Sequence, residues 1–194
     1  MFDFFKKKNV LKTTDYIFRS EEAKYQKLAV NLLAQKKVLL LYYFEDTKQQ
    51  LINILQANNI AFSEIESAAP TVYLLQASTL LNKINISDYH IIFAEHHPSF
   101  QIENNIKQHL VETLSQNEVI FYTSLEDVLL QKFGSERIIA ILDKMGFKED
   151  EIIEHKMISD SIENVQQKID KQLQFTSDTR MRKDWFEINK IDLT

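Results

Sequence analysis

Short apolar runs alternate with amphipathic stretches along the first 125 residues. The runs at 38–44 and 119–122 are almost continuously apolar, which is typical of parallel strands covered on both faces. Further strands are predicted at 60–65, 71–75 and 90–94. The stretches between them have helical periodicity, and this alternation predicts an α/β fold with helices on both faces of a mostly parallel sheet of about five strands.

Helix signals separate the predicted strands. Ser20 precedes two glutamates and can cap one helix, and capping boxes begin at Asp46 and at Ser124. Gly134 and Gly146 each follow an apolar helical pattern and are expected to end it, because glycine adopts the left-handed conformation at little cost. Shorter helical patterns cover 78–85 and, with apolar residues every four positions, 102–114.

A long amphipathic helix is predicted near the C-terminal end of the sequence. Its apolar positions step by three or four residues from Ile158 to Leu173, and we expect this stripe to pack on the rest of the chain. The following residues, 174–194, have no assigned conformation. Trp185 and Phe186 in this tail are interpreted either as docked core residues or as exposed partner contacts.

The first eight residues, MFDFFKKK, combine phenylalanines and lysines. A secretory signal has a longer apolar core, so this arm is not predicted to be one. One interpretation is a hydrophobic hook that folds back onto the domain. The other is an anchor in which Phe2, Phe4 and Phe5 contact a partner or a membrane surface.

Composition excludes several classes of function. The formal net charge of −5 argues against general affinity for nucleic acid, and the absence of cysteine excludes disulfides and thiolate chemistry. No apolar run reaches the length of a membrane span. The sequence holds two glycines, both assigned to helix ends, and neither the GxxxxGK[ST] nor the GxGxxG pattern occurs.

The segment from 117 to 170 resembles SecA, the motor ATPase of bacterial preprotein export. Residues 121–138 read FYTSLEDVLLQKFGSERI, and 147–169 read FKEDEIIEHKMISDSIENVQQKI. In SecA the similar region ends the second RecA-like nucleotide-binding domain and begins the helical scaffold. The weaker resemblance from Thr14 onward implies an arm at 1–13, a three-layer RecA-like, P-loop NTPase-type domain at 14–155 and a helical extension at 156–194.

The resemblance also locates where the family's catalytic residues would lie. Residues 90–115 align with a SecA block that carries three arginines, and those positions are Lys107, His109 and Glu112 here. Arginine presents a planar, permanently charged fork to phosphate, whereas the three replacements do not. Residues 75–83 also lack the family's glycines. The same block keeps the family residue at Glu95, His97, Ser99, Ile102 and Asn104.

These features lead to the expectation of a SecA-like interaction module that is not an enzyme and binds no cofactor or metal. The adjacent Glu95, His96 and His97 lack the spacing of a zinc motif and are interpreted as a loop. We expect a protein partner, either export machinery or a precursor protein, and a cytoplasmic location with peripheral contact at the inner face of the membrane. One alternative is half of an ATPase whose phosphate loop comes from a partner. Another is a helicase-like nucleic-acid binder, which the acidic composition disfavours.

Overall fold

A computed structural model describes residues 11–64, 71–82, 86, 88–113, 118–131, 135–154, 156–174 and 179–191. Within them, one sheet of six strands has the order β1-β6-β5-β2-β4-β3, and every neighbouring pair is parallel. The central strands are buried along their length because their sequences are almost wholly apolar. The strands are β1 (Lys12–Phe18), β2 (Val38–Tyr42), β3 (Phe62–Ser63), β4 (Val72–Gln76), β5 (His90–Phe93) and β6 (Glu118–Ser124).

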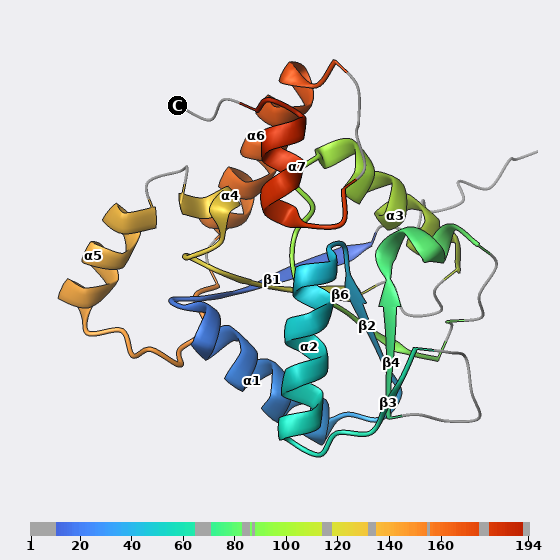
Figure 1. Cartoon of the computed structure of the whole chain (residues 1–194). Helices are drawn as coiled ribbons and strands as arrows, with labels where there is room; N and C mark the ends of the chain where they lie inside the picture. Colours follow the sequence, from blue (N-terminus) through green and yellow to red (C-terminus); the bar gives the residue numbers. More distant parts are fainter. Residues whose placement is uncertain are drawn as a thin grey trace, which may run out of the picture.

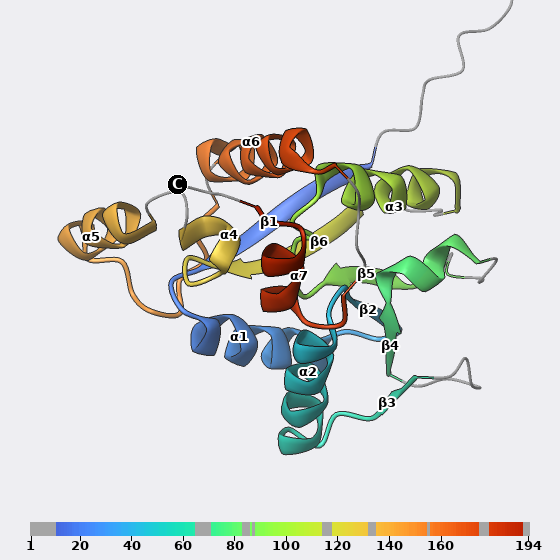
Figure 2. The same ribbon diagram turned by 45° about the horizontal axis from the view of Figure 1, so that its top comes forward.

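Helices cover both faces of the sheet (Figures 1 and 2). The helices α1 (Glu21–Ala34) and α2 (Glu45–Ala57) bury their apolar residues in the core on one face. On the other face, α3 (Phe100–Thr113) and α6 (Lys156–Gln172) contribute to a second core. The three-layer α/β architecture is therefore confirmed. The remaining helices are the 3₁₀ turn η1 (Ala77–Leu81), α4 (Val128–Gln131), α5 (Ser135–Met145) and α7 (Arg182–Ile188).

Two elements were not predicted from the sequence. The edge strand β1 has the sequence KTTDYIF, in which polar residues lie on both faces of the first half, so it lacks a strong strand pattern. Its pairing with β6 along seven positions, from Lys12 opposite Glu118 to Phe18 opposite Ser124, forms it nonetheless. The short helix α7 forms in the tail because Trp185 is completely buried against the second core.

The predicted helix caps have mixed outcomes. Ser20 caps α1 as expected, since its Oγ accepts a hydrogen bond of 3.2 Å from the backbone N–H of Ala23. The box at Ser124 is wrong, because β6 runs through that residue and the carboxylate of Asp127 accepts from Leu129 N instead. Helix α2 begins after Phe44 without a side-chain cap, so the box at Asp46 is wrong as well.

The end of α5 agrees with the prediction from glycine. Gly146 follows the last helical residue and has φ of +75°, a conformation that is costly for residues with a Cβ atom. The other glycine, Gly134, lies outside the described residues. Part of the 60–65 strand and of the 78–85 helix also lies outside them, and the described portions are β3 and η1.

The apolar stripe of α6 packs against the sheet face that also holds α3. Ile158, Ile162, Val165 and Ile169 are all at most 5% exposed. We expect Ile162→Val to lower the free energy of unfolding by about 1 kcal/mol, because it removes one buried methyl group. Ile188→Val, at a side chain that is 55% exposed, serves as the matched control and should change it by less than about 0.5 kcal/mol. Urea unfolding measures both, and equal small effects would contradict tight packing of α6.

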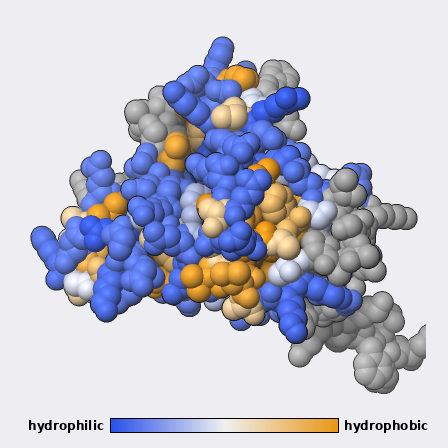
Figure 3. All heavy atoms as spheres, turned by 60° about the horizontal axis from the view of Figure 1, so that its bottom comes forward, coloured by the Kyte–Doolittle hydropathy of each residue, from blue (hydrophilic) through white to orange (hydrophobic). Residues whose placement is uncertain are grey.

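The surface carries local concentrations of apolar side chains. Helix α1 exposes Val30 and Leu33, at 59% and 61% of their surface. In the view of Figure 3, apolar residues gather in one area that hydrophilic residues surround. Across the described residues, no helix has both the length and the apolar character required to cross a membrane.

Candidate functional site

The carboxyl ends of β2 and β5 lie side by side at the topological switch point, where the connections from neighbouring strands run to opposite sides of the sheet. The chain leaves β2 through α2 toward β3 on one side, and it leaves β5 through α3 toward β6 on the other. The two strands are direct neighbours, with Leu41 opposite Phe93 at the end of their pairing. Open α/β sheets bind ligands in the crevice outside such a switch point.

A hollow of about 360 Å³ opens beside this switch point. Aromatic rings form part of its lining, and Gln76, Ser78 and Asn105 add polar groups to it. The amide of Gln76 donates a hydrogen bond of 3.3 Å to the backbone carbonyl of Tyr43. Rings beside amide and hydroxyl groups suit a planar ligand with polar edges. The aromatic side chains in the lining are Tyr43, Phe44 and His97.

Tyr43 presents a buried polar atom in this wall. Its side chain is 7% exposed, and its hydroxyl has no hydrogen-bond partner among the described residues. Burial, supported by the charges of Glu103 and Glu95, raises the pKa of the Tyr43 hydroxyl. The phenol therefore stays neutral and keeps a hydrogen available for donation.

Glu95 fixes the shape of the loop that follows β2. One oxygen of its carboxylate accepts hydrogen bonds from the backbone N–H groups of Tyr43 and Phe44, at 2.7 and 3.0 Å. The other oxygen accepts one of 2.7 Å from the hydroxyl of Thr47. Because Glu95 follows β5, these bonds join the carboxyl ends of the two strands at the switch point.

Arg182 closes the same edge from the C-terminal segment. Its guanidinium forms an ion pair with Glu95 and another, of 2.5 Å, with Asp127. Burial raises the pKa of Asp127, but the Arg182 charge and other contacts outweigh this and lower it overall. Arg182 was not predicted as a site residue, because it is an arginine in a tail whose sequence has no recognised pattern. Figure 2 shows α7 in front of the sheet, between the two helical layers.

The tail aromatics take the first of the two alternatives. Trp185 is fully buried, and its ring meets that of His97 edge-on with 5.4 Å between centroids. Phe186 is half-buried and contacts the same core. The alternative that Trp185 is an exposed partner contact is therefore wrong, because the buried indole fills space beside the switch point. Phe2, Phe4 and Phe5 lie outside the described residues.

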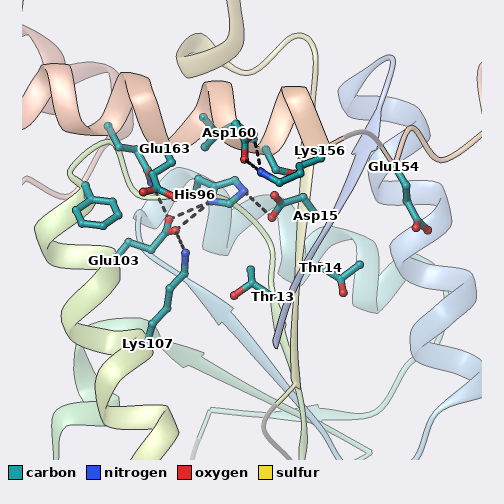
Figure 4. A pocket seen from close by; sticks show the side chains of 14 residues that line it. Thr13, Thr14, Asp15, His96, Glu103, Lys107, Glu154, Lys156, Asp160 and Glu163 are labelled. Atoms are coloured by element: carbon teal, nitrogen blue, oxygen red, sulfur yellow. Dashed lines mark hydrogen bonds and ion pairs between the residues drawn. The ribbon is translucent and has the colours of Figure 1, made fainter. Parts of the chain in front are cut away.

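A second polar cluster lies beneath α6, around a hollow of about 500 Å³ (Figure 4). The buried imidazole of His96 stands between two carboxylates, with Nδ1 3.1 Å from Glu103 and Nε2 3.4 Å from Asp15. Lys107 Nζ lies 2.6 Å from the other oxygen of Glu103. The cluster therefore alternates negative and positive charges through a buried region.

The charges of this cluster hold each other ionised. Burial alone lowers the pKa of His96, but the charges of Glu103 and Asp15 raise it to about 9. Burial acts in the opposite sense on Glu103, whose pKa is lowered to about 2 by His96 and Lys107. Gln166 of α6 donates to Glu103 and to the carbonyl of His97, at 3.0 and 2.7 Å. The cluster thus fastens α6 to the domain.

The three predicted arginine-finger positions are not brought together at the switch point. Lys107 faces Glu103 in the cluster below α6, whereas the same helix presents Asn105 to the hollow at the switch point. His109 is half-buried and Glu112 is exposed, and neither is among the residues that line the two hollows. The sequence pattern could not show that these positions face different sites, because one side of α3 faces the cluster below α6 and a neighbouring side faces the hollow at the switch point.

Glu95, His96 and His97 point toward different partners despite being adjacent. Glu95 joins the loop after β2, His96 joins the cluster under α6, and the ring of His97 stacks on Phe44. Across the described residues, no group of three or more histidine, aspartate or glutamate side chains has a geometry that could hold a metal ion.

Comparison with known proteins relates part of the chain to SecA. Residues 56–150 match the family model of the SecA P-loop domain. The "Protein translocase subunit SecA" of Alkaliphilus oremlandii is 42% identical over 85 residues, which are 44% of this chain and 10% of that protein. The same subunit of Acinetobacter baumannii is 44% identical over 81 residues, 42% of this chain and 9% of that protein. The match therefore spans about a tenth of the length of these relatives.

A solved structure gives a more distant likeness. The C-terminal part of the Fun30 ATPase domain is 14% identical, with a TM-score of 0.41, and the match covers 75% of this chain and 54% of that one.

The expectation that the chain is not an enzyme is wrong. The matching model is a P-loop domain of SecA, and this relationship points to an ATPase. The expectation rested on the missing phosphate-loop pattern, the missing glycines at 75–83 and the replaced arginines at positions 107, 109 and 112, all of which are local features of the sequence. Residues that contact a nucleotide come from several loops at the carboxyl edge of such a sheet, so replacements on α3 do not decide the activity.

Proposed function

We propose that this chain, through the SecA relationship of residues 56–150, works in protein translocation as part of an ATPase. In this proposal the carboxyl edge of its sheet supplies one side of a nucleotide site. The phosphate loop comes from outside these 194 residues, because the GxxxxGK[ST] pattern does not occur in them. The site is then completed by a partner domain or subunit that carries this loop.

The observation that carries the proposal is the hollow at the switch point. The carboxyl ends of β2, β4 and β5 contribute Phe44, Gln76 and His97 to its lining. Rings can stack on a nucleobase, and amide side chains can pair with its polar edge. Glu95 holds the β2 loop in place through two backbone hydrogen bonds, which gives the lining a fixed geometry before any ligand arrives.

We also propose that the chain acts together with another protein of the translocation process. The relatives are subunits of a protein translocase, so the partner that completes the site would be a component of export machinery. We place this activity in the cytoplasm, with contact to the inner face of the membrane.

The proposal is tested by measuring ATP turnover of the chain alone, of a SecA translocase subunit alone and of the two mixed. We expect turnover in the mixture to exceed the sum of the separate rates. Asn105→Ala removes a polar group from the hollow and should weaken nucleotide affinity about fivefold, because one hydrogen bond contributes about 1 kcal/mol.

The matched control for this experiment is Gln108→Ala, on the same helix. Gln108 is exposed and is not among the residues that line the hollow, so this variant should behave as the parent chain does. Strictly additive turnover, together with equal behaviour of the two variants, would exclude a shared nucleotide site at this edge.

A further inference from the structure

The tail segment, residues 179–188, runs along the edge of the sheet that holds the hollow at the switch point (Figure 2). Its first residue, Thr179, is part of the lining of that hollow. The backbone carbonyl of Arg180 accepts a hydrogen bond of 2.7 Å from the N–H of Glu45, the first residue of α2. Because α2 has no side-chain cap, this carbonyl satisfies one of the N–H groups that a helix leaves unpaired at its start. The tail segment therefore contacts the start of α2 directly, beside Phe44.

Two side chains of the tail segment contact the aromatic lining of the hollow. The guanidinium carbon of Arg182 lies 5.8 Å from the centroid of the Phe44 ring, which is within the range of a cation–π contact. Phe44 also stacks on the ring of His97, with 5.5 Å between centroids. The indole of Trp185 meets His97 edge-on at 5.4 Å, an arrangement that aromatic rings favour. Phe44 and His97 are thus both held by side chains of the tail segment.

Most side chains of α7 are exposed, so the docking of the tail segment depends on few contacts. Lys183, Asp184, Glu187 and Ile188 are exposed, whereas Trp185 is completely buried. The buried N–H of the Trp185 indole has no hydrogen-bond partner among the described residues. The ring contacts of Trp185, rather than a hydrogen bond, therefore determine where its side chain lies.

We infer that the tail segment forms a wall of the hollow at the switch point, and that Trp185 is a positioning residue for this site. Trp185 acts on the ring of Phe44 through His97. Arg182 contacts the same ring and, through Glu95, holds the backbone of the loop after β2. Docking of the tail segment and binding of a ligand in the hollow are then coupled, and each strengthens the other by the same factor. The ligand is the nucleotide of the proposed function, and this part of the inference rests on that function.

The first test needs no nucleotide and uses Trp185 as a fluorescent reporter, because it is the only tryptophan in the sequence. His97→Ala removes the ring that the indole contacts in the hollow. We expect the emission maximum of Trp185 to move to longer wavelength and its quenching by acrylamide to increase. His90→Ala, at an exposed position at the start of β5, is the matched control and should behave as the parent chain does. Unchanged emission and quenching in His97→Ala would overturn the inference.

Hydrogen–deuterium exchange tests the opposite direction, from the tail segment to the hollow. Trp185→Ala should speed exchange of the backbone amides of Tyr43 and Phe44 several-fold. Trp185→Phe should preserve the parent rates, because phenylalanine keeps a ring and the indole N–H makes no hydrogen bond within the described residues. Ile188→Ala, at an exposed position of the same helix, is the control. Equal exchange at Tyr43 and Phe44 in Trp185→Ala and Ile188→Ala, with slow exchange retained in β4 and β6, would overturn the inference. If Trp185→Ala does not fold, the fluorescence of His97→Ala decides.

The coupling to nucleotide is measured in the mixture with a SecA translocase subunit. Mg-ATP should slow exchange in α7 of the parent chain, and Trp185→Ala should weaken nucleotide affinity about tenfold, as is typical of coupled sites. Trp185→Phe should retain the parent affinity. Slower exchange at Tyr43 and Phe44 without any change in α7 would support the nucleotide site and overturn its coupling to the tail segment. No response to Mg-ATP in either place, when both nucleotide-free tests give the expected results, would overturn the nucleotide site and support the tail segment as a wall of the hollow.

Discussion

Arg182→Gln is expected to lower the free energy of unfolding by about 3–5 kcal/mol, since it removes one partner from a buried ion cluster. Glu95 is completely buried and Asp127 is 5% exposed, and both contact the guanidinium. Without it, two carboxylates remain close together with little access to water. Glutamine retains polar atoms but supplies no positive charge, so the carboxylates stay uncompensated.

Urea unfolding of the parent chain and of the variant measures this difference. Lys183→Gln is the matched control, because it removes a positive charge from the next residue, which is exposed. The control should change the free energy by less than about 0.5 kcal/mol. Similar small effects for both variants would show that Arg182 is not essential for closing the carboxyl edge.

The second large effect is a loss of stability at alkaline pH. The pKa of His96 is raised from 6.5 to about 9 in the folded chain, so folding favours its protonated form. The stabilisation that protonated His96 gives to the folded chain is therefore complete below pH 6.5 and is lost as the pH rises through 9. The shift corresponds to about 3 kcal/mol. The charged groups that face His96 are Asp15 and Glu103, with Lys107 beyond Glu103.

Urea unfolding at a series of pH values between 6 and 9.5 measures this loss. His96→Gln should be less stable at pH 6 but should largely lose the decline in stability across this range. His90→Gln, at an exposed position at the start of β5, should retain the decline. A parent chain whose stability is constant from pH 6.5 to 9 would show that the cluster does not hold His96 protonated.

Much of the fold follows from apolar pattern and helix signals. The runs around β2 and β6 have strong strand patterns because these strands are buried on both faces, as Leu40 and Phe121 are. Strand β1 gave a weak signal because Thr13 and Thr14 lie at an edge, where burial does not select apolar residues. The cap at Ser124 failed because pairing with Phe18 of β1 extends β6 through it.

The candidate site was less accessible to sequence reasoning. Glu95 was noted because it matches the family block, but its hydrogen bonds to the loop after β2 depend on how the strands are ordered. Arg182 reaches it from 87 residues further along the chain, and no local pattern indicates such a contact. Lys107 and Asn105 face different hollows from one helix, and this depends on how α3 packs against the sheet and beside α6.

Hydrogen–deuterium exchange of the chain, mixed with a SecA translocase subunit, tests the central claim most directly. The measurement compares exchange with and without Mg-ATP. A nucleotide at the switch point should slow exchange in the loop after β2, around Tyr43 and Phe44, and at the carboxyl end of β4 and the start of η1, around Gln76 and Ser78. Exchange in α5, none of whose described residues lines this hollow, should stay unchanged. Unaltered exchange in both loops, at ATP concentrations that saturate the mixture, would contradict a nucleotide site at the carboxyl edge of this sheet.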